Sequence, residues 1–141
     1  MSAWGPGSFD NDIASDWAAD LADGGGLEMV RESLRTAALC PLEEYLESDE
    51  GSEALAAAEV VAAAGGRPVK SVGMGTAGPH ALAWAKGHKG AGSDAMVELA
   101  QEAVERVSGP ESELVELWGA AAAAEAREFF AELEDLRARL A

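Results

Sequence analysis

The chain has 141 residues, of which 26 are acidic and 10 are lysine or arginine, giving a formal net charge of −16. This charge argues against binding of nucleic acid or an anionic membrane through the bulk surface, because both are also negative. Hydrophobic residues make up 48% of the sequence, which excludes a disordered acidic tail. The length and composition predict a single acidic helical domain over residues 1–141.

The chain begins with a stretch rich in aromatic, glycine and polar residues, Ala-Trp-Gly-Pro-Gly-Ser-Phe-Asp-Asn-Asp over residues 3–12. Its glycines allow positive φ and its proline fixes φ, so Trp4 and Phe9 are predicted to turn back onto a core. The polar run that follows supplies N-cap candidates for a helix. The residues assigned to this structural motif are Trp4, Gly5, Gly7, Phe9, Asn11, Asp12 and Trp17.

Helical periodicity continues through the first half of the chain. Apolar residues spaced three or four apart predict helices over 13–21, ended by three glycines, and over 27–38, stopped by Cys40-Pro41. Pro41 can open a third, short helical segment that includes Leu42, Tyr45 and Leu46.

An alanine-rich segment over 53–64 predicts a buried central helix, with Ser52 as a possible cap and Gly65-Gly66 at its end. Only Glu53 and Glu59 are expected to face water there. The next segment, 65–92, is predicted to be a glycine-rich loop interrupted by a short helical run around 79–86.

The last third of the chain is also predicted to be helical. Ser93 or Asp94 caps one helix, and Ser-Gly-Pro at 108–110 ends it. A long final helix is expected from about 111 to 140, with Gly119 as a point where it could bend. Alternation typical of a strand occurs only at 69–72 and has no partner, so the expected fold is an irregular all-α bundle of five or six helices.

The opening motif, with a further tryptophan at position 17, resembles an uncharacterised bacterial family, a domain of unknown function. The resemblance extends to residues 56–63 with 66–68, 103–107, 112–118 and 133–140, and therefore to nearly the whole chain. The sequence departs from the family pattern in the alanine run 120–124 and in Phe129-Phe130. The resemblance implies one compact domain, but the family supplies no established reaction, ligand or partner.

The charge is distributed unevenly. Residues 60–93 contain no acid and carry four cations, whereas both flanking parts are strongly acidic. One interpretation of this basic, glycine-rich segment is an anion site, because glycine lets backbone N–H groups converge and lysine adds charge. The other is a solvated loop, or one whose cations dock on the acidic helices. The residues proposed for an anion site are Lys70, Gly73, Gly75, Gly78, His80, Lys86 and Lys89.

No catalytic, cofactor or metal site is predicted. Residues 73–78 match the spacing G-x-G-x-x-G, but the strand and the βαβ unit that a dinucleotide site needs are absent from the pattern. The aspartates near the N-terminus favour helix capping over metal binding. Cys40, the single cysteine, is interpreted as a structural thiol.

The main hypothesis for function is a non-enzymatic module that binds another, basic protein, with an immunity- or antitoxin-like role as one version. The alternatives are a protein that binds a small anion or nucleotide through residues 67–89, and a structural homo-oligomer that uses its alanine-rich helices as a seam. A soluble, cytoplasmic protein is expected, because the chain begins with no secretory signal and has no long apolar run. The residues proposed for partner binding are Glu43, Glu44, Glu47, Asp49, Glu50 and Glu53.

Overall fold

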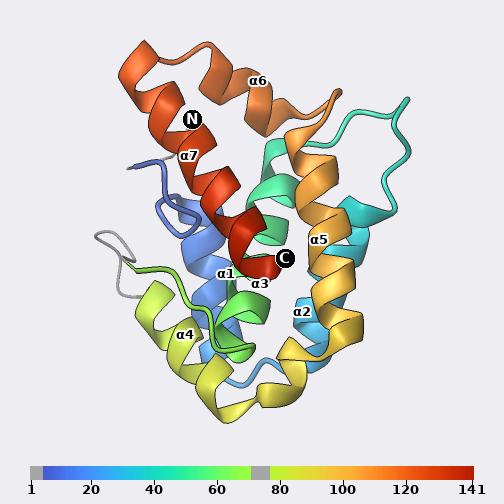
Figure 1. The fold of residues 1–141 in the computed structure, drawn as a ribbon, viewed down its shortest axis with the longest axis vertical. Coiled ribbons are helices and arrows are strands. Elements are labelled where there is room, and N and C mark those ends of the chain that lie inside the picture. The colour runs from blue at the N-terminus through green and yellow to red at the C-terminus, as the bar shows by residue number, and fades with distance from the viewer. Residues whose placement is uncertain (1–4, 71–76) are drawn as a thin grey trace.

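The computed structural model describes residues 5–70 and 77–141. Within these residues the chain forms seven α-helices and no strand, so the predicted all-α class is confirmed, with more helices than expected (Figure 1). The elements are α1 (Asp12–Ala22), α2 (Leu27–Ala38), α3 (Ser48–Ala64), α4 (Ala77–Gly87), the 3₁₀ helix η1 (Lys89–Gly92), α5 (Asp94–Ser108), α6 (Glu113–Gly119) and α7 (Ala123–Leu140).

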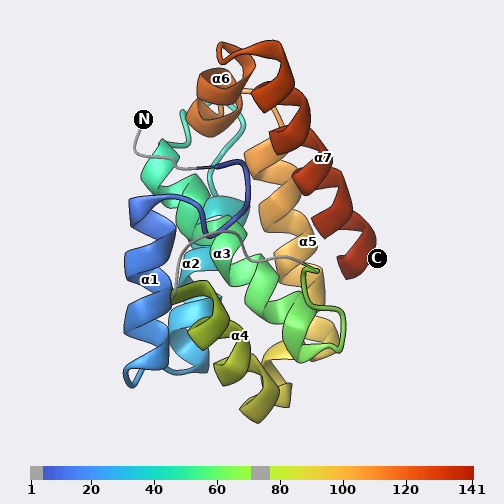
Figure 2. The same ribbon diagram turned by 90° about the vertical axis from the view of Figure 1, so that its left-hand side faces the viewer.

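The alanine-rich helix α3 lies at the centre of the bundle. Residues 54–62 are all buried, and α1, α2, α4, α5 and α7 pack around this helix (Figure 2). Alanine suits this place because it favours the helix and its short side chain lets neighbouring helices approach closely. The alanines of α3 therefore pack against the chain's own helices.

The N-terminal helices follow the sequence prediction closely. Asn11 caps α1, because its Oδ1 accepts a hydrogen bond from the backbone N–H of Ala14 at 2.8 Å. Phe9 and Trp17 are buried as expected, and the Trp17 indole N–H donates to the Ser33 hydroxyl on α2 at 2.9 Å. Trp4 lies outside the described residues.

The short helix predicted after Pro41 is wrong, since residues 41–47 form turns and extended chain. Leu46 instead makes a parallel bridge with Ser112. Its N–H donates to the Glu111 carbonyl at 2.8 Å, and its carbonyl accepts from the Glu113 N–H at 2.9 Å. The backbone N–H and carbonyl of Leu46, which in a helix would bond within that helix, therefore bond to a segment distant in the sequence.

Helix α3 begins a full turn earlier than predicted, at Ser48. Glu113 on α6 accepts a hydrogen bond from the Ser48 N–H at 2.8 Å, so a distant carboxylate satisfies the first turn. Ser52, the predicted cap, lies buried inside the helix.

The predicted glycine-rich loop over 65–92 is largely helical, because α4 and η1 occupy most of residues 77–92. Irregular chain is found, among the described residues of this segment, at 65–70 and at His88. Gly92 serves close packing: a Cβ there would lie 2.5 Å from the Gly65 backbone nitrogen. The strand-like pattern at 69–72 lies partly outside the described residues, and Val69 and Lys70 are not in a strand.

The single long helix predicted at the C-terminus is divided into α6 and α7. Gly119, the expected weak point, is the last residue of α6. The rings of Trp118 and Phe129 stack with centroids 5.0 Å apart, so α7 folds back against α6 rather than continuing it.

Buried side chains in the described part of the chain form a hydrophobic cluster that runs from Phe9 to Leu140. Its largest fully buried apolar members are leucines of α1, α2 and α7 together with Leu46, and burying each contributes about 1.5–3 kcal/mol. None of the described helices combines the length and hydropathy needed to cross a membrane.

Candidate functional site

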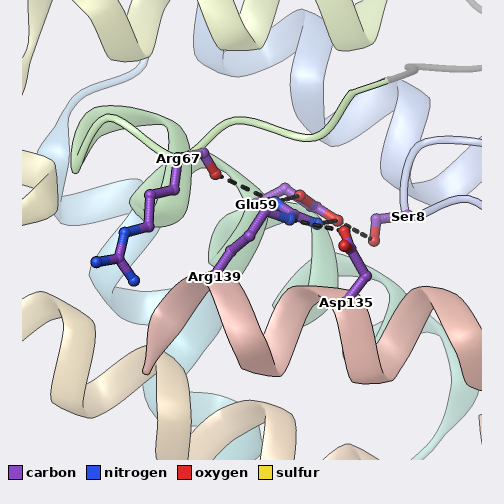
Figure 3. Close-up of polar contacts among 5 residues, drawn as sticks. All are labelled: Ser8, Glu59, Arg67, Asp135 and Arg139. Atoms are coloured by element: carbon purple, nitrogen blue, oxygen red, sulfur yellow. Dashed lines mark hydrogen bonds and ion pairs between the residues drawn. The ribbon is translucent and has the colours of Figure 1, made fainter.

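A polar cluster centred on the buried Glu59 joins the N-terminal segment, α3 and α7 (Figure 3). Glu59 lies in the middle of α3 and is only 1% exposed, which corrects the expectation that it faces water. Its carboxylate accepts hydrogen bonds from Arg139 Nη1 at 2.8 Å and Nη2 at 3.2 Å, and from the Ser8 hydroxyl at 2.8 Å. A buried charge is tolerated only when it is paired in this way.

Arg139 links this cluster to the end of the chain. Its Nε donates to Asp135 at 2.7 Å, and its Nη1 also approaches the Arg67 carbonyl at 3.4 Å. Desolvation by itself would lower the pKa of Arg139, but the hydrogen bonds and charges of Glu59 and Asp135 outweigh it and raise that pKa above its ordinary value. The polar groups of this cluster hydrogen-bond to one another, so the role of the cluster is to hold α7 against α3.

The glycines of the opening motif make room for Asp10. A Cβ on Gly5 or Gly7 would lie 2.9 or 2.7 Å from the Asp10 carboxylate, which accepts a hydrogen bond from the Gly7 N–H at 3.1 Å. The glycine spacing is therefore a packing requirement, which agrees with the structural interpretation of the motif.

A buried arginine fixes the loop between α2 and α3. Arg106 on α5 is 5% exposed, and its guanidinium donates only to backbone carbonyls and one thiol rather than to a carboxylate. Its acceptors are the carbonyls of Cys40 (3.0 Å), Pro41 (3.2 Å), Glu44 (2.6 Å), Pro110 (2.9 Å) and Glu111 (3.4 Å), and the Cys40 sulfur (3.4 Å).

This anchored loop carries exposed apolar side chains. Among the residues that the structure describes, the large hydrophobic side chains classed as exposed are Leu39 (67%), Leu42 (63%) and Tyr45 (45%). The Tyr45 hydroxyl donates to Glu116 on α6 at 3.2 Å. Desolvation and this hydrogen bond raise the pKa of Tyr45, so its phenol remains a neutral donor.

Carboxylates surround these apolar side chains. Four of the six acidic residues proposed from the sequence are exposed on the loop and the first turn of α3, and Glu50 and Glu53 are half-buried. Glu44 and Glu50 line one groove of about 470 Å³ with Leu39 and Tyr45. We call this region the loop surface, and it consists of Leu39, Leu42, Tyr45, Glu43, Glu44, Glu47, Asp49, Glu50 and Glu53.

Crowding among these acids is visible at Glu53. Burial raises the pKa of Glu53, and the neighbouring charges of Asp49 and Glu50 raise it further. A cation brought to this place would favour the ionised carboxylate.

The residues proposed for an anion site are only partly brought together. Lys86 and Lys89 line one groove of about 980 Å³ between the end of α3 and α4. Lys70 and His80 are exposed, and Gly78 is buried in the first turn of α4. None of these three is among the lining residues of that groove. Gly73 and Gly75 lie outside the described residues.

The sequence pattern indicated the acidic stretch but neither the roles of Arg106 and Arg139 nor the apolar members of the loop surface. A glutamate inside an alanine and valine helix was a signal for a buried partner. The role of Arg106 had no local signal, because most of its acceptors lie more than 60 residues away in sequence.

These features define an all-α protein with an acidic, partly apolar surface on an anchored loop. The family described as "Domain of unknown function (DUF4259)" matches residues 2–135, so the chain belongs to that family. This confirms the resemblance seen in the sequence. Comparison with curated proteins and with solved structures found no match.

Proposed function

We propose that this protein binds a basic protein through the loop surface and has no catalytic role. The observation that carries the proposal is that the exposed Leu39, Leu42 and Tyr45 all fall on one anchored loop that is bordered by carboxylates. An apolar centre with a polar rim is the usual anatomy of a protein interface.

The anchoring by Arg106 supports this proposal. A loop held by several hydrogen bonds from one buried guanidinium loses little further entropy when a partner binds. The strain at Glu111, whose φ is +55°, fits the same interpretation, because such backbone persists only where the surroundings enforce it.

The net charge of this protein predicts that its partner has a basic surface. With a net charge of −16, the protein attracts a basic surface and speeds encounter with it. An immunity- or antitoxin-like role, in which the protein covers a basic toxin or nuclease surface, is the concrete version that we favour. We place this role in the cytoplasm, where the single Cys40 thiol stays reduced.

The test uses affinity-tagged protein purified from the cells that make it. The double variant Glu43→Lys/Glu47→Lys reverses two exposed charges of the loop surface. Its matched control, Glu125→Lys/Glu128→Lys, changes the net charge equally on exposed positions of α7. We expect a basic partner to co-purify with the wild type and the control, and to be lost with the loop variant and in 1 M NaCl, where charges are screened within about 3 Å. Recovery that is unaffected by salt and by the loop variant would contradict the proposal.

A further inference from the structure

A groove of about 980 Å³ lies away from the loop surface, between the C-terminal end of α3 and α4. This size is at the upper end of the range for small-molecule sites, which are mostly apolar with a few polar groups. Its apolar walls come from Ala63, Ala64, Pro68, Pro79, Leu82 and Ala83.

Hydrogen bonds and a ring contact with residues outside the groove fix the walls of the groove. The Arg67 N–H donates to the Ala62 carbonyl at 2.8 Å, and its guanidinium donates to the Ala141 carbonyl at 2.9 Å. On α4, the Trp84 indole N–H donates to the Gly25 carbonyl at 3.2 Å, and its ring stacks on His88 with centroids 3.9 Å apart. A groove with fixed walls needs little rearrangement to bind a ligand.

Two cations line the groove, and carboxylates do not. Lys86 and Lys89 are exposed lining residues, and neither forms an ion pair with any described residue. In contrast, Arg137 and Arg139 are both paired with carboxylates. Because residues 60–93 contain no acid, an anion in this groove meets two cations that have no neighbouring carboxylate within that segment of the sequence.

We propose that this groove binds a small amphipathic anion, a free medium-chain carboxylate whose apolar body lies along Leu82 and the two prolines and whose head group meets Lys86 and Lys89. The apolar walls alone would accept a neutral chain, and the lysines alone would accept a small inorganic anion. Selectivity for a molecule that has both parts follows from their combination.

The experiment measures the binding of three probes to the full chain by calorimetry and thermal shift. The probes are decanoate, its neutral analogue decanol, and inorganic phosphate, which is an anionic head without an apolar body. We expect saturable binding of decanoate with a raised Tm, weaker binding of decanol, and no response to phosphate.

Variants of the groove test whether decanoate binds there. Lys86→Ala/Lys89→Ala is expected to weaken decanoate binding about tenfold, because two favourable charge contacts are lost. Ala83→Glu, an exposed wall position that gains a negative charge, is expected to do the same. Arg127→Ala, which removes an exposed cation of α7, is the control and should bind like the wild type. Equal binding of decanol and decanoate, no saturable binding, or unchanged affinity in the lysine variant would overturn the proposal. The outcome is independent of the loop surface, whose partner binding these variants leave intact.

Discussion

At the residue scale, the most informative side chain is Glu59. Its position in an alanine and valine helix predicted burial of its neighbours, yet the carboxylate itself was expected to face water. Its partner Arg139 is 80 positions away, and only the tertiary arrangement brings the two within 2.8 Å. A glutamate among alanines and valines indicates that a buried partner exists, but the local pattern does not say which residue it is, so the pairing with Arg139 was not predicted.

The buried pair makes a stability prediction. Arg139→Ala leaves the Glu59 carboxylate buried without its counter-charge, which is expected to cost about 3 kcal/mol in the free energy of unfolding. Arg137→Ala, two positions earlier on the same helix, removes ion pairs with the exposed carboxylates Glu105 and Glu134 and should cost less than about 1 kcal/mol. Urea unfolding of both variants decides the matter, and equal losses would contradict the account.

Arg106 makes a different prediction, because its acceptors are carbonyls of the loop. Arg106→Met keeps the apolar stem but removes all the donors, and the expected cost exceeds about 3 kcal/mol, since hydrogen bonds to charged groups contribute about 1.5–3 kcal/mol each. Arg106→Lys keeps the charge with fewer donors and should fall in between. Hydrogen exchange at the Leu46 N–H, which bonds the Glu111 carbonyl, should speed up in Arg106→Met. Unchanged exchange there would show that the guanidinium does not anchor the loop.

At the scale of the elements, the sequence pattern predicts a helix well where the residues that determine it lie close together in the sequence. Helices α1, α2 and α5 have amphipathic spacing and end at glycines or close to a proline, and each lies close to its predicted range. Asn11 and Ser93 cap two of them as proposed. The errors fall where distant groups act, as at the loop 41–47, whose backbone binds Arg106 and residues 111–113.

Glycine also has a role that the sequence did not reveal. Gly92→Ala would place a methyl group 2.5 Å from the backbone of Gly65, where neither segment can yield cheaply. We expect a loss of about 1–3 kcal/mol, typical of overpacking. Gly90→Ala, in the same 3₁₀ helix but facing open space, should change stability by less than about 0.5 kcal/mol. Thermal unfolding of the two variants makes the comparison, and similar Tm values would exclude a close approach of η1 to α3.

At the scale of the whole molecule, burial of carboxylates and the crowding of acids make stability depend on pH. The folded protein raises the pKa of Glu53, so between its unfolded and folded pKa values the native state binds more protons than the unfolded state. Stability contributed by this group therefore falls as pH rises through that window, starting from the ordinary pKa of 4.5.

A neutral replacement tests this effect. Glu53→Gln is expected to be more stable than the wild type at pH 7, and the difference should vanish below pH 4.5, where the wild-type carboxyl is itself protonated. Glu125→Gln, on the exposed face of α7, should show little difference at either pH. Chemical unfolding at a series of pH values measures both. A Glu53→Gln variant less stable than the wild type at pH 7 would show that the carboxylate makes favourable contacts instead.

Site-specific photo-crosslinking can detect the proposed contact between the loop surface and a basic protein. A benzophenone amino acid is placed at Leu42 on the loop surface and, as the control, at the exposed Ala124 of α7. Irradiation in the cells that make the protein is then followed by mass spectrometry. We predict a discrete adduct with one basic protein from position 42 only, with the adduct lost when cell extracts in 1 M NaCl are irradiated instead. No adduct at position 42, the same adducts from both positions, or an acidic partner would contradict the account.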